Sequence, residues 1–255
     1  MTSAPPTVTL LGVTSIDPPL ALTDELRARL SRVSTATLTS QLQRRGIRST
    51  FLSGLRPVGE GQRMVGLAHT LRYVPLREDL VAALNLGQNA QRRAIEALRP
   101  TEVLVIEARG EPDAGTIGDI FVRRAMHLGA AGVVTDGALR DTPAIRALGL
   151  PVYHRSSHAA TLGRLHMPLD HQVPVACAGV TVMPGDVIVG DGEGAVVVPA
   201  ALAEEVSVDA LRQELEEEWA FERVAAGEST IGVFPVSDER RAEFDAWLAA
   251  RPDRD

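Results

Sequence analysis

Apolar positions along this chain follow two different spacings. In some segments they recur every three or four residues, as in amphipathic helices, and in others they alternate or form short continuous runs, as in strands. This alternation of element types predicts an α/β fold. Helices are predicted over 23–33, 34–46, 79–98, 119–128, 142–148, 201–226 and 238–250. Strands are predicted over 64–74, 103–108, 132–135, 151–153, 174–177, 180–182, 187–190 and 195–199.

The chain shows no internal repeat and no low-complexity linker, so most of its 255 residues are expected to form one domain. Residues 1–22 hold four prolines and little periodicity, which predicts an extended N-terminal arm. The main domain is expected over 23–236. Residues 237–255 are expected to form a C-terminal helix and tail.

The segment 114–153 carries the groups best suited to chemistry. It is expected to contain a glycine turn, a helix, a buried strand, a polar loop over 136–141, a second helix and a second strand. The first helix would begin near Gly118, and the unpaired N–H groups of Ile120 and Phe121 would form a site for a carboxylate or phosphate. The polar loop would lie past the C-terminal end of the strand, where α/β proteins usually hold ligands.

Two neighbouring residues end that loop. Arg140 is a permanent cation that can bind a carboxylate or an enolate oxygen. Asp141 offers hard oxygen ligands that suit Mg²⁺ or Mn²⁺. In the alternative interpretation Asp141 caps the next helix, with Pro143 in its first turn, and Arg140 is a surface residue. The spacing alone favours neither interpretation.

The absence of lysine restricts the possible chemistry more than any average of composition. All 26 basic residues are arginine. A lysine Schiff base is therefore excluded, and with it a class I aldolase or lysine-bound pyridoxal phosphate. A Walker A phosphate loop is excluded as well. If the protein forms a carbanion beside a carbonyl group, a metal and arginine must stabilise it.

Charge and apolar content indicate where the protein works. The net charge of −7 argues against a general nucleic-acid surface. No apolar run approaches the roughly 18 residues of a membrane span, and no signal peptide is evident. The single cysteine, Cys177, fits a reducing cytoplasm and is expected to be a small buried residue rather than a nucleophile.

The histidines give a weaker signal. His154 and His158 stand four residues apart, a spacing that would suit zinc on a helix, but they follow a predicted strand. His166 and His171 flank Pro168 and are expected to be loop residues.

Several motifs together resemble a known family. They are GD at 118–119, GAAGVVTDGALRD at 129–141, PVY at 151–153 and PGDVIVGDGEGAVVVP at 184–199, with TATLTSQLQRRGIRSTFLSGLRPV upstream. Over roughly 34–236 the chain resembles the family of regulator of ribonuclease activity A and the 4-hydroxy-4-methyl-2-oxoglutarate or 4-carboxy-4-hydroxy-2-oxoadipate aldolases. One departure is Thr101, where the family usually has glycine after the proline.

The resemblance implies a role for each candidate residue. Asp141 would bind the divalent metal, Mg²⁺ or Mn²⁺, and Arg140 would contact the keto oxygen of the substrate. Asp119 would act in catalysis and hold the metal through water. Backbone amides that follow it would bind the carboxylate of pyruvate. The implied substrate-binding residues are Gly118, Ile120, Phe121 and Arg140.

The resemblance also implies an assembly. In the family a glutamate of the late acidic helix reaches the site of a neighbouring subunit, although a solvated helix face is the simpler interpretation for most acidic residues there. The candidates are Glu214, Glu216, Glu217 and Glu218. The implied assembly is a homotrimer or a homohexamer. The implied fold is a single-domain β/β/α sandwich that resembles the swivelling phosphohistidine domain.

The resemblance implies a metal-dependent, class II-type pyruvate aldolase, which the absence of lysine also favours, and its aldolase-like catalytic domain would cover 23–236. It would cleave a small 4-hydroxy-2-oxo acid to pyruvate and would decarboxylate oxaloacetate as a side reaction. One alternative is a protein-binding regulator of ribonuclease activity without catalysis. Another is a related lyase or decarboxylase that acts on a sugar-derived 2-oxo acid.

Overall fold

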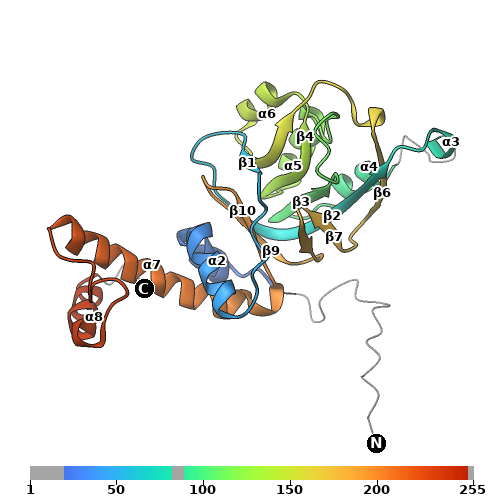
Figure 1. The fold of residues 1–255 in the computed structure, drawn as a ribbon. Coiled ribbons are helices and arrows are strands. Elements are labelled where there is room, and N and C mark those ends of the chain that lie inside the picture. The colour runs from blue at the N-terminus through green and yellow to red at the C-terminus, as the bar shows by residue number, and fades with distance from the viewer. Residues whose placement is uncertain (1–19, 82–88, 252–255) are drawn as a thin grey trace, which may run out of the picture.

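The computed structural model describes residues 20–81 and 89–251. A strongly curved sheet forms the body of the molecule, with helices packed on its outer side and a helical arm that projects from one end (Figure 1). The helices are α1 (Asp24–Arg32), α2 (Thr35–Arg44), α3 (Glu78–Val81), α4 (Ala90–Glu96), α5 (Asp119–His127), α6 (Thr142–Leu148), α7 (Ala203–Ala225) and α8 (Arg241–Ala249). The strands are β1 (Arg56–Pro57), β2 (Met64–Pro75), β3 (Glu102–Glu107), β4 (Gly132–Leu139), β5 (Val152–Ser157), β6 (His166–His171), β7 (Val175–Cys177), β8 (Val180–Val182), β9 (Val187–Gly190) and β10 (Ala195–Val198).

The main sheet is nearly closed into a barrel. Its strand order is β1-β5-β4-β3-β2-β9-β10, with β2 to β5 parallel and β6 paired to β2. The segment 50–57 joins the two ends of the sheet. Phe51 bridges to Val196 of β10, and a few residues later Arg56 pairs with His154 of β5. The expected α/β class is confirmed, and the analogy to a phosphohistidine domain stays a prediction.

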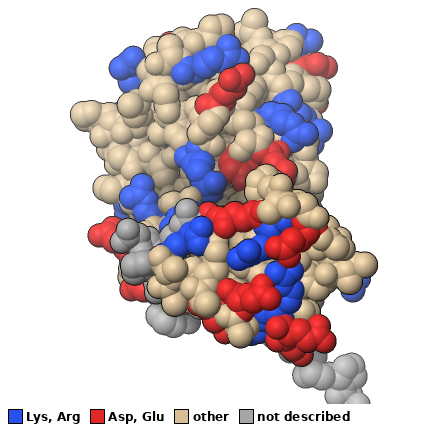
Figure 2. Space-filling view, turned by 90° about the vertical axis from the view of Figure 1, so that its left-hand side faces the viewer, with Lys and Arg blue, Asp and Glu red and all other residues tan. Residues whose placement is uncertain are grey.

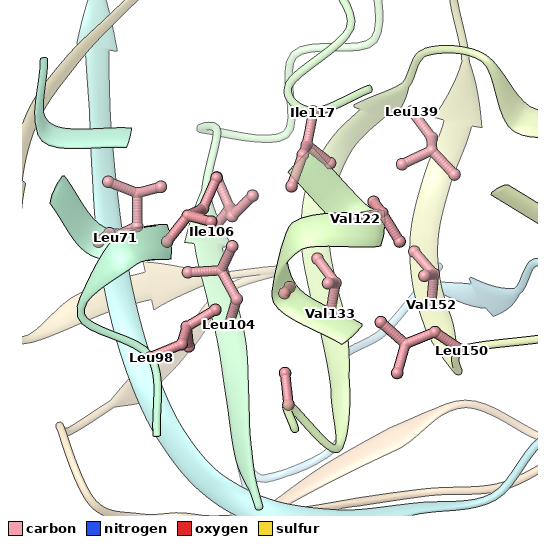
Figure 3. Close-up of a cluster of buried hydrophobic side chains, with 14 of the residues drawn as sticks. Leu71, Leu98, Leu104, Ile106, Ile117, Val122, Val133, Leu139, Leu150 and Val152 are labelled. Atoms are coloured by element: carbon pink, nitrogen blue, oxygen red, sulfur yellow. The ribbon is translucent and has the colours of Figure 1, made fainter. Parts of the chain in front are cut away.

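Both faces of the inner parallel strands β3 and β4 are buried, one under the helices and the other inside the barrel. On β3, Leu104 and Ile106 point to the outer layer, where they pack with residues of α4, α5 and α6 (Figure 3). The alternate residues Val103 and Val105 point into the barrel, where the β7–β8 hairpin contributes Cys177 and other buried residues. This alternation explains the continuous apolar run in the sequence of β3.

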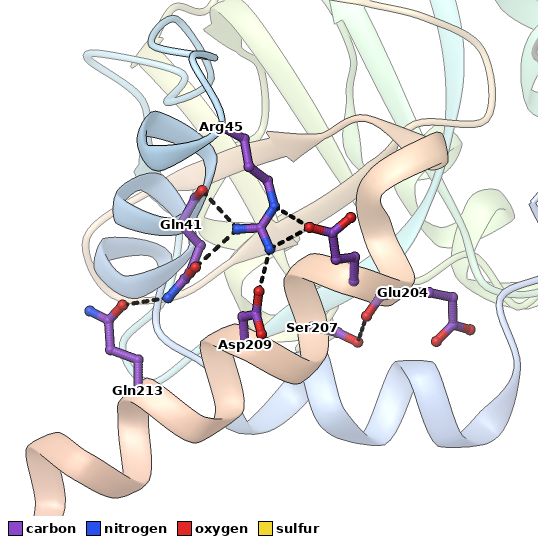
Figure 4. A network of polar contacts seen from close by, with 7 residues as sticks. Gln41, Arg45, Glu204, Ser207, Asp209 and Gln213 are labelled. Atoms are coloured by element: carbon purple, nitrogen blue, oxygen red, sulfur yellow. Dashed lines mark hydrogen bonds and ion pairs between the residues drawn. The ribbon is translucent and has the colours of Figure 1, made fainter.

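The helices α1, α2 and α7 cover a different part of the sheet, beside β9 and β10. Arg45, just after α2, makes ion pairs with Glu205 and Asp209 of α7 and donates to Gln41 (Figure 4). A buried carboxylate, Asp191 in the β9–β10 turn, accepts hydrogen bonds from the N–H and hydroxyl groups of Thr35. These contacts position the root of the long helix α7 on the barrel.

The outer half of α7 and the helix α8 form an arm with an apolar cluster of its own. Trp219 of α7 packs edge-on against Phe244 of α8, and Phe244 stacks on Trp247. Seen from the left of Figure 1, acidic and basic side chains gather over the helices in the lower part of the molecule (Figure 2). Within the described part of the chain, no helix is long and apolar enough to cross a membrane.

The structure corrects several predicted elements. The loop expected over 136–141 is largely strand, because β4 continues to Leu139 with every residue buried. The strand expected over 151–153 extends to Ser157. The single helix expected over 79–98 is seen as α3 and α4, and 82–88 lie outside the described residues. Likewise, 1–19 of the predicted N-terminal arm are not described.

Thr101, the residue that departs from the family pattern, lies in the turn before β3. Its φ of 67° is in the left-handed region, where glycine is favoured. Its N–H group donates to the carbonyl of Gly129 at 2.8 Å, so the turn keeps its hydrogen bond despite the side chain. The departure therefore leaves the course of the backbone intact.

Candidate functional site

Main-chain hydrogen bonds hold the two predicted halves of the site side by side. The segment before α5 runs beside the end of β4, where Gly115 bridges to Ala138. Thr116 donates its N–H to the carbonyl of Ala138 at 2.8 Å, and Arg140 donates its N–H to the carbonyl of Ile117 at 3.1 Å. As a result, the start of α5 and the Arg140 region face the same cleft.

Two glycines permit this close approach. A Cβ atom at Gly115 would lie 2.7 Å from the Cβ of Arg140, and one at Gly118 would lie 2.9 Å from Oδ2 of Asp141. Neither distance is compatible with normal packing. The spacing of glycines in the sequence thus reflects the contact between two segments that are about twenty residues apart.

The cleft has a volume of about 480 Å³. Arg140 and Asp141 lie at its mouth, with side chains 43% and 38% exposed and 3.7 Å between Arg140 Nε and Asp141 Oδ1. Its wall and floor include charged, polar and apolar groups. The lining residues are Gln91, Gly115, Thr116, Ile117, Gly118, Asp119, Ile120, Phe121, Arg140, Asp141, Thr161 and Leu162.

Asp141 does not cap α6 through its side chain. It stands at the N-cap position, but no capping hydrogen bond is formed, and its φ of 58° is in the left-handed region. Such a conformation is strained for a residue other than glycine and occurs often at functional sites. The structure therefore favours the interpretation in which the Asp141 carboxylate is directed to the cleft.

The carboxylate of Asp119 lies at the start of α5. Its Oδ1 accepts the N–H of Ile120 at 2.8 Å, so that amide already has a partner. The N–H of Phe121 has no partner among the residues that the structure describes, and it lies in the first turn of α5. Of the two predicted amides, Phe121 is thus the one left to bind an anionic oxygen.

The donor set fits a magnesium-type ion. Asp119 and Asp141 bring two carboxylates to one cleft, and Mg²⁺ is usually bound by one or two carboxylates together with waters and substrate oxygens. In 20–81 and 89–251 no group of three or more metal-ligating side chains is found.

The floor of the cleft contains residues that the sequence did not reveal as candidates. Gln91, in the first turn of α4, donates from Nε2 to the Tyr73 hydroxyl and to the Thr116 carbonyl, both at 2.7 Å. Tyr73 donates to the same carbonyl at 3.0 Å. Burial raises the pKa of Tyr73, so its hydroxyl stays protonated.

The late glutamates belong to α7, which lies well apart from α5 and α6 (Figure 1), and none of them lines the cleft. Glu214 accepts the N–H of Ser34 at 2.7 Å, Glu216 pairs with Arg241 at 2.5 Å, and Glu217 accepts from Gln213. Glu217 and Glu218 line a groove on α7 beside the exposed Phe221.

Two of the four histidines considered above were predicted wrongly. His166 and His171 begin and end β6 rather than lying in a loop. His154 is in β5 and donates from Nδ1 to the carbonyl of Arg56, and no metal cluster in the described part includes it. Burial lowers the pKa of His154, His166 and His171.

Cys177 is fully buried, and burial raises the pKa of its thiol well above the usual value. A thiol in such surroundings is a poor nucleophile. The prediction of a small buried residue at this position is confirmed.

Comparison with known proteins identifies the family. The family model described as RraA-like, Aldolase/RraA, matches residues 35–197. The chain belongs to the RraA-like family. It is 33% identical over 171 residues to a Halalkalibacterium halodurans protein named "Putative 4-hydroxy-4-methyl-2-oxoglutarate aldolase". The alignment covers 67% of this chain and 76% of that protein.

Other members differ in size and description. Protein DlpA of Legionella pneumophila is 29% identical to this chain. The alignment covers 79% of this chain but only 32% of DlpA. Streptomyces coelicolor RraAS2, described as an unusual member of the RNase ES inhibitor RraA protein family, is 37% identical with a TM-score of 0.71. The match covers 78% of this chain and 96% of RraAS2. An uncharacterized Pseudomonas syringae protein is 28% identical with a TM-score of 0.73, over 84% and 98% of the two chains.

Proposed function

We propose that this member of the RraA-like family is a divalent-metal-dependent lyase that cleaves a 4-hydroxy-2-oxo acid to pyruvate. The observation that supports it most is the placement of Arg140 and Asp141 beside Gly118 and Asp119 at one cleft. The names of several relatives point in the same direction. The absence of lysine leaves metal and arginine as the groups able to stabilise an enolate.

Different residues of the cleft are proposed to bind different groups of the substrate and the metal. The Phe121 N–H and Arg140 bind the carboxylate and the 2-oxo oxygen, since both are donors directed to the cleft. Asp141 would hold the metal, and Asp119 would support it through water. When bound, Mg²⁺ or Mn²⁺ would polarise the 2-oxo group as a Lewis acid.

The bond changes follow from these positions. The C4 hydroxyl gives up its proton through a water to Asp119, and a C4–oxygen double bond forms. The C3–C4 bond breaks, and its electron pair becomes the C2–C3 double bond of the pyruvate enolate. Arg140 stabilises the negative oxygen at C2. A proton taken up at C3 then completes pyruvate. Oxaloacetate decarboxylation yields the same enolate, so it is the expected companion activity.

We further propose that the protein works in the cytoplasm as a homotrimer or homohexamer in which α7 completes a neighbour's site. The cleft offers two carboxylates of its own, and α7 carries Glu217 and Glu218 on its surface beside Phe221, which is 76% exposed. An exposed aromatic next to acidic groups suits a subunit contact.

Metal removal tests the proposed reaction. Protein treated with EDTA and then desalted is expected to release no pyruvate from a panel of 4-hydroxy-2-oxo acids, including sugar-derived ones. Added Mg²⁺ or Mn²⁺ is expected to restore release, because no lysine can take over the role of the metal. Full activity after exhaustive metal removal would rule the mechanism out.

A second candidate function, regulation of a ribonuclease, is favoured by the similarity to RraAS2. The same preparations distinguish the two functions. Asp141→Ala is expected to abolish pyruvate release. If the wild-type protein releases no pyruvate but inhibits a ribonuclease of the RNase ES type, and Asp141→Ala inhibits it equally, the regulator is the correct function.

A further inference from the structure

Gln91 is an unusual residue to find at the floor of an open cleft. It lines the cleft although only 1% of its surface is exposed, so only a small part of the side chain can touch a ligand. Its neighbours Tyr73 and Thr116 are buried as well, with exposures of 1% and 0%. The orientation of the Gln91 amide therefore decides what the floor offers to a substrate.

The hydrogen-bond partners fix that orientation. The Thr116 carbonyl can only accept, so the Gln91 atom 2.7 Å from it must be the NH₂ group. The Tyr73 hydroxyl gives its proton to the same carbonyl and accepts the second N–H of Gln91. Both donors of the amide are thus used inside the protein, and a flipped amide would place oxygen against oxygen.

The remaining polar atom is Oε1. It makes no hydrogen bond to any residue that the structure describes. Gln91 lines the cleft, and Oε1 is the one polar atom of its side chain that is left to face it.

The chemistry of the other groups shows what Oε1 can bind. The Phe121 N–H and Arg140 are donors for anionic oxygens, and Asp119 and Asp141 are charged and serve the metal. Gln91 Oε1 is an uncharged acceptor, which suits a hydroxyl group. Of the groups on a 4-hydroxy-2-oxo acid, only the C4 hydroxyl is a neutral donor. Oxaloacetate in its keto form has none.

We propose that Gln91 selects the substrate by accepting a hydrogen bond from its C4 hydroxyl, an inference that rests on the function proposed above. A substrate without this hydroxyl leaves Oε1 desolvated and unpaired, and sites built in this way discriminate strongly. Gln91 is a specificity residue: its amide accepts from the hydroxyl when the substrate binds and does not take its proton, which the hydroxyl turns toward the water only when the reaction begins. Tyr73 and Thr116 are positioning residues that fix the amide.

The test compares two reactions that share the enolate and differ in the hydroxyl. Gln91→Met keeps the size of the side chain and removes the acceptor. It is expected to lower kcat/KM for 4-hydroxy-4-methyl-2-oxoglutarate cleavage roughly tenfold, mainly through KM, because one neutral hydrogen bond is lost. Oxaloacetate decarboxylation is expected to stay unchanged or to rise, because the variant has no acceptor that this substrate would leave unpaired. Tyr73→Phe removes one hydrogen-bond partner of the Gln91 amide. It should lower the same activity selectively, but by a smaller factor.

Gln62→Met is the matched control. Gln62 donates to the Leu150 carbonyl and accepts from Gly59, away from this cleft, so the ratio of the two activities should not change. Equal losses of both reactions in Gln91→Met, or none in either, would overturn the role of Gln91 alone. A wild-type protein inactive on both substrates would overturn the proposed function and this inference with it.

Discussion

At the scale of single residues, the site depends on two glycines as much as on its charged groups. Gly118 has φ −114° and ψ 176°, which any residue can adopt, so its role is not backbone freedom. What matters is the missing side chain, because a Cβ there would meet Asp141 Oδ2 at 2.9 Å. Gly118 therefore controls the position of the proposed metal ligand.

This gives a sharp prediction for Gly118→Ala. The short Asp141 side chain must move to accommodate the new methyl group, and a displacement of about 1 Å at a reacting centre can lower the rate up to about 100-fold. Pyruvate release is expected to fall by at least tenfold, and half-maximal activity should require more Mg²⁺. The free energy of unfolding should change by less than about 1 kcal/mol, since alanine is only a poorer helix cap.

Gly192→Ala is the control for this change. Gly192 lies in the β9–β10 turn, and a Cβ there would meet nothing within 4 Å. It should leave both activity and metal requirement unchanged. Normal turnover and metal requirement in Gly118→Ala would remove Asp141 from the mechanism.

The sequence revealed some site residues and not others for a physical reason. Asp119, Arg140 and Asp141 stand in short motifs beside glycines, and their chemistry is evident from their type. Gln91 lies well before them in the chain, and its role arises only when Tyr73 and Thr116 fold against it. No local pattern marks such a residue.

At the scale of elements, the errors concentrate where polar residues are buried. The predicted strand stopped before Asp136 because an aspartate that follows an apolar run usually marks a loop. In the fold its carboxylate accepts three main-chain N–H groups, from Ala108 at 2.5 Å, Gly110 at 3.0 Å and Ala178 at 3.2 Å. These partners come from distant segments, so the sequence near β4 could not show that the residue would be satisfied while buried.

The helical arm offers a prediction about cooperativity. The two tryptophans of the chain, Trp219 and Trp247, both lie in the arm cluster, so tryptophan fluorescence reports on the arm alone. Phe244 is fully buried between them, and Phe244→Ala is expected to cost about 3–5 kcal/mol. The fluorescence transition should then occur at a lower denaturant concentration than the far-UV circular dichroism transition.

A core variant of the barrel serves for comparison. Leu104→Ala, in β3, should shift both transitions together because α7 is rooted on the barrel. If Phe244→Ala also shifts both signals together, the arm and the barrel unfold as one unit and the arm has no independent stability.

At the scale of the whole molecule, large apolar side chains are exposed both at the cleft and on the helical arm. Ile120 at its edge is 77% exposed, and Phe221 and Ile231 on the arm are 76% and 89% exposed. Large exposed apolar groups at both places suit a contact in which the arm of one protomer covers the cleft of the next. Such a head-to-tail contact would give the proposed ring if the rotation from one protomer to the next closes.

Hybrid assemblies test this arrangement. Asp141→Ala inactivates the cleft of its own subunit, whereas Glu217→Gln combined with Glu218→Gln would inactivate the cleft of the neighbour. When the two proteins are co-expressed, a subunit with an intact cleft can meet a neighbour with intact glutamates at about a quarter of the sites. Pyruvate release from the co-purified hybrid should therefore exceed that of either parent severalfold.

Glu204→Gln, at the root of the same helix, should need no rescue because Glu204 pairs with Arg29 of its own chain. A hybrid no more active than its parents, or a fully active monomer at assay concentration, would refute the shared site.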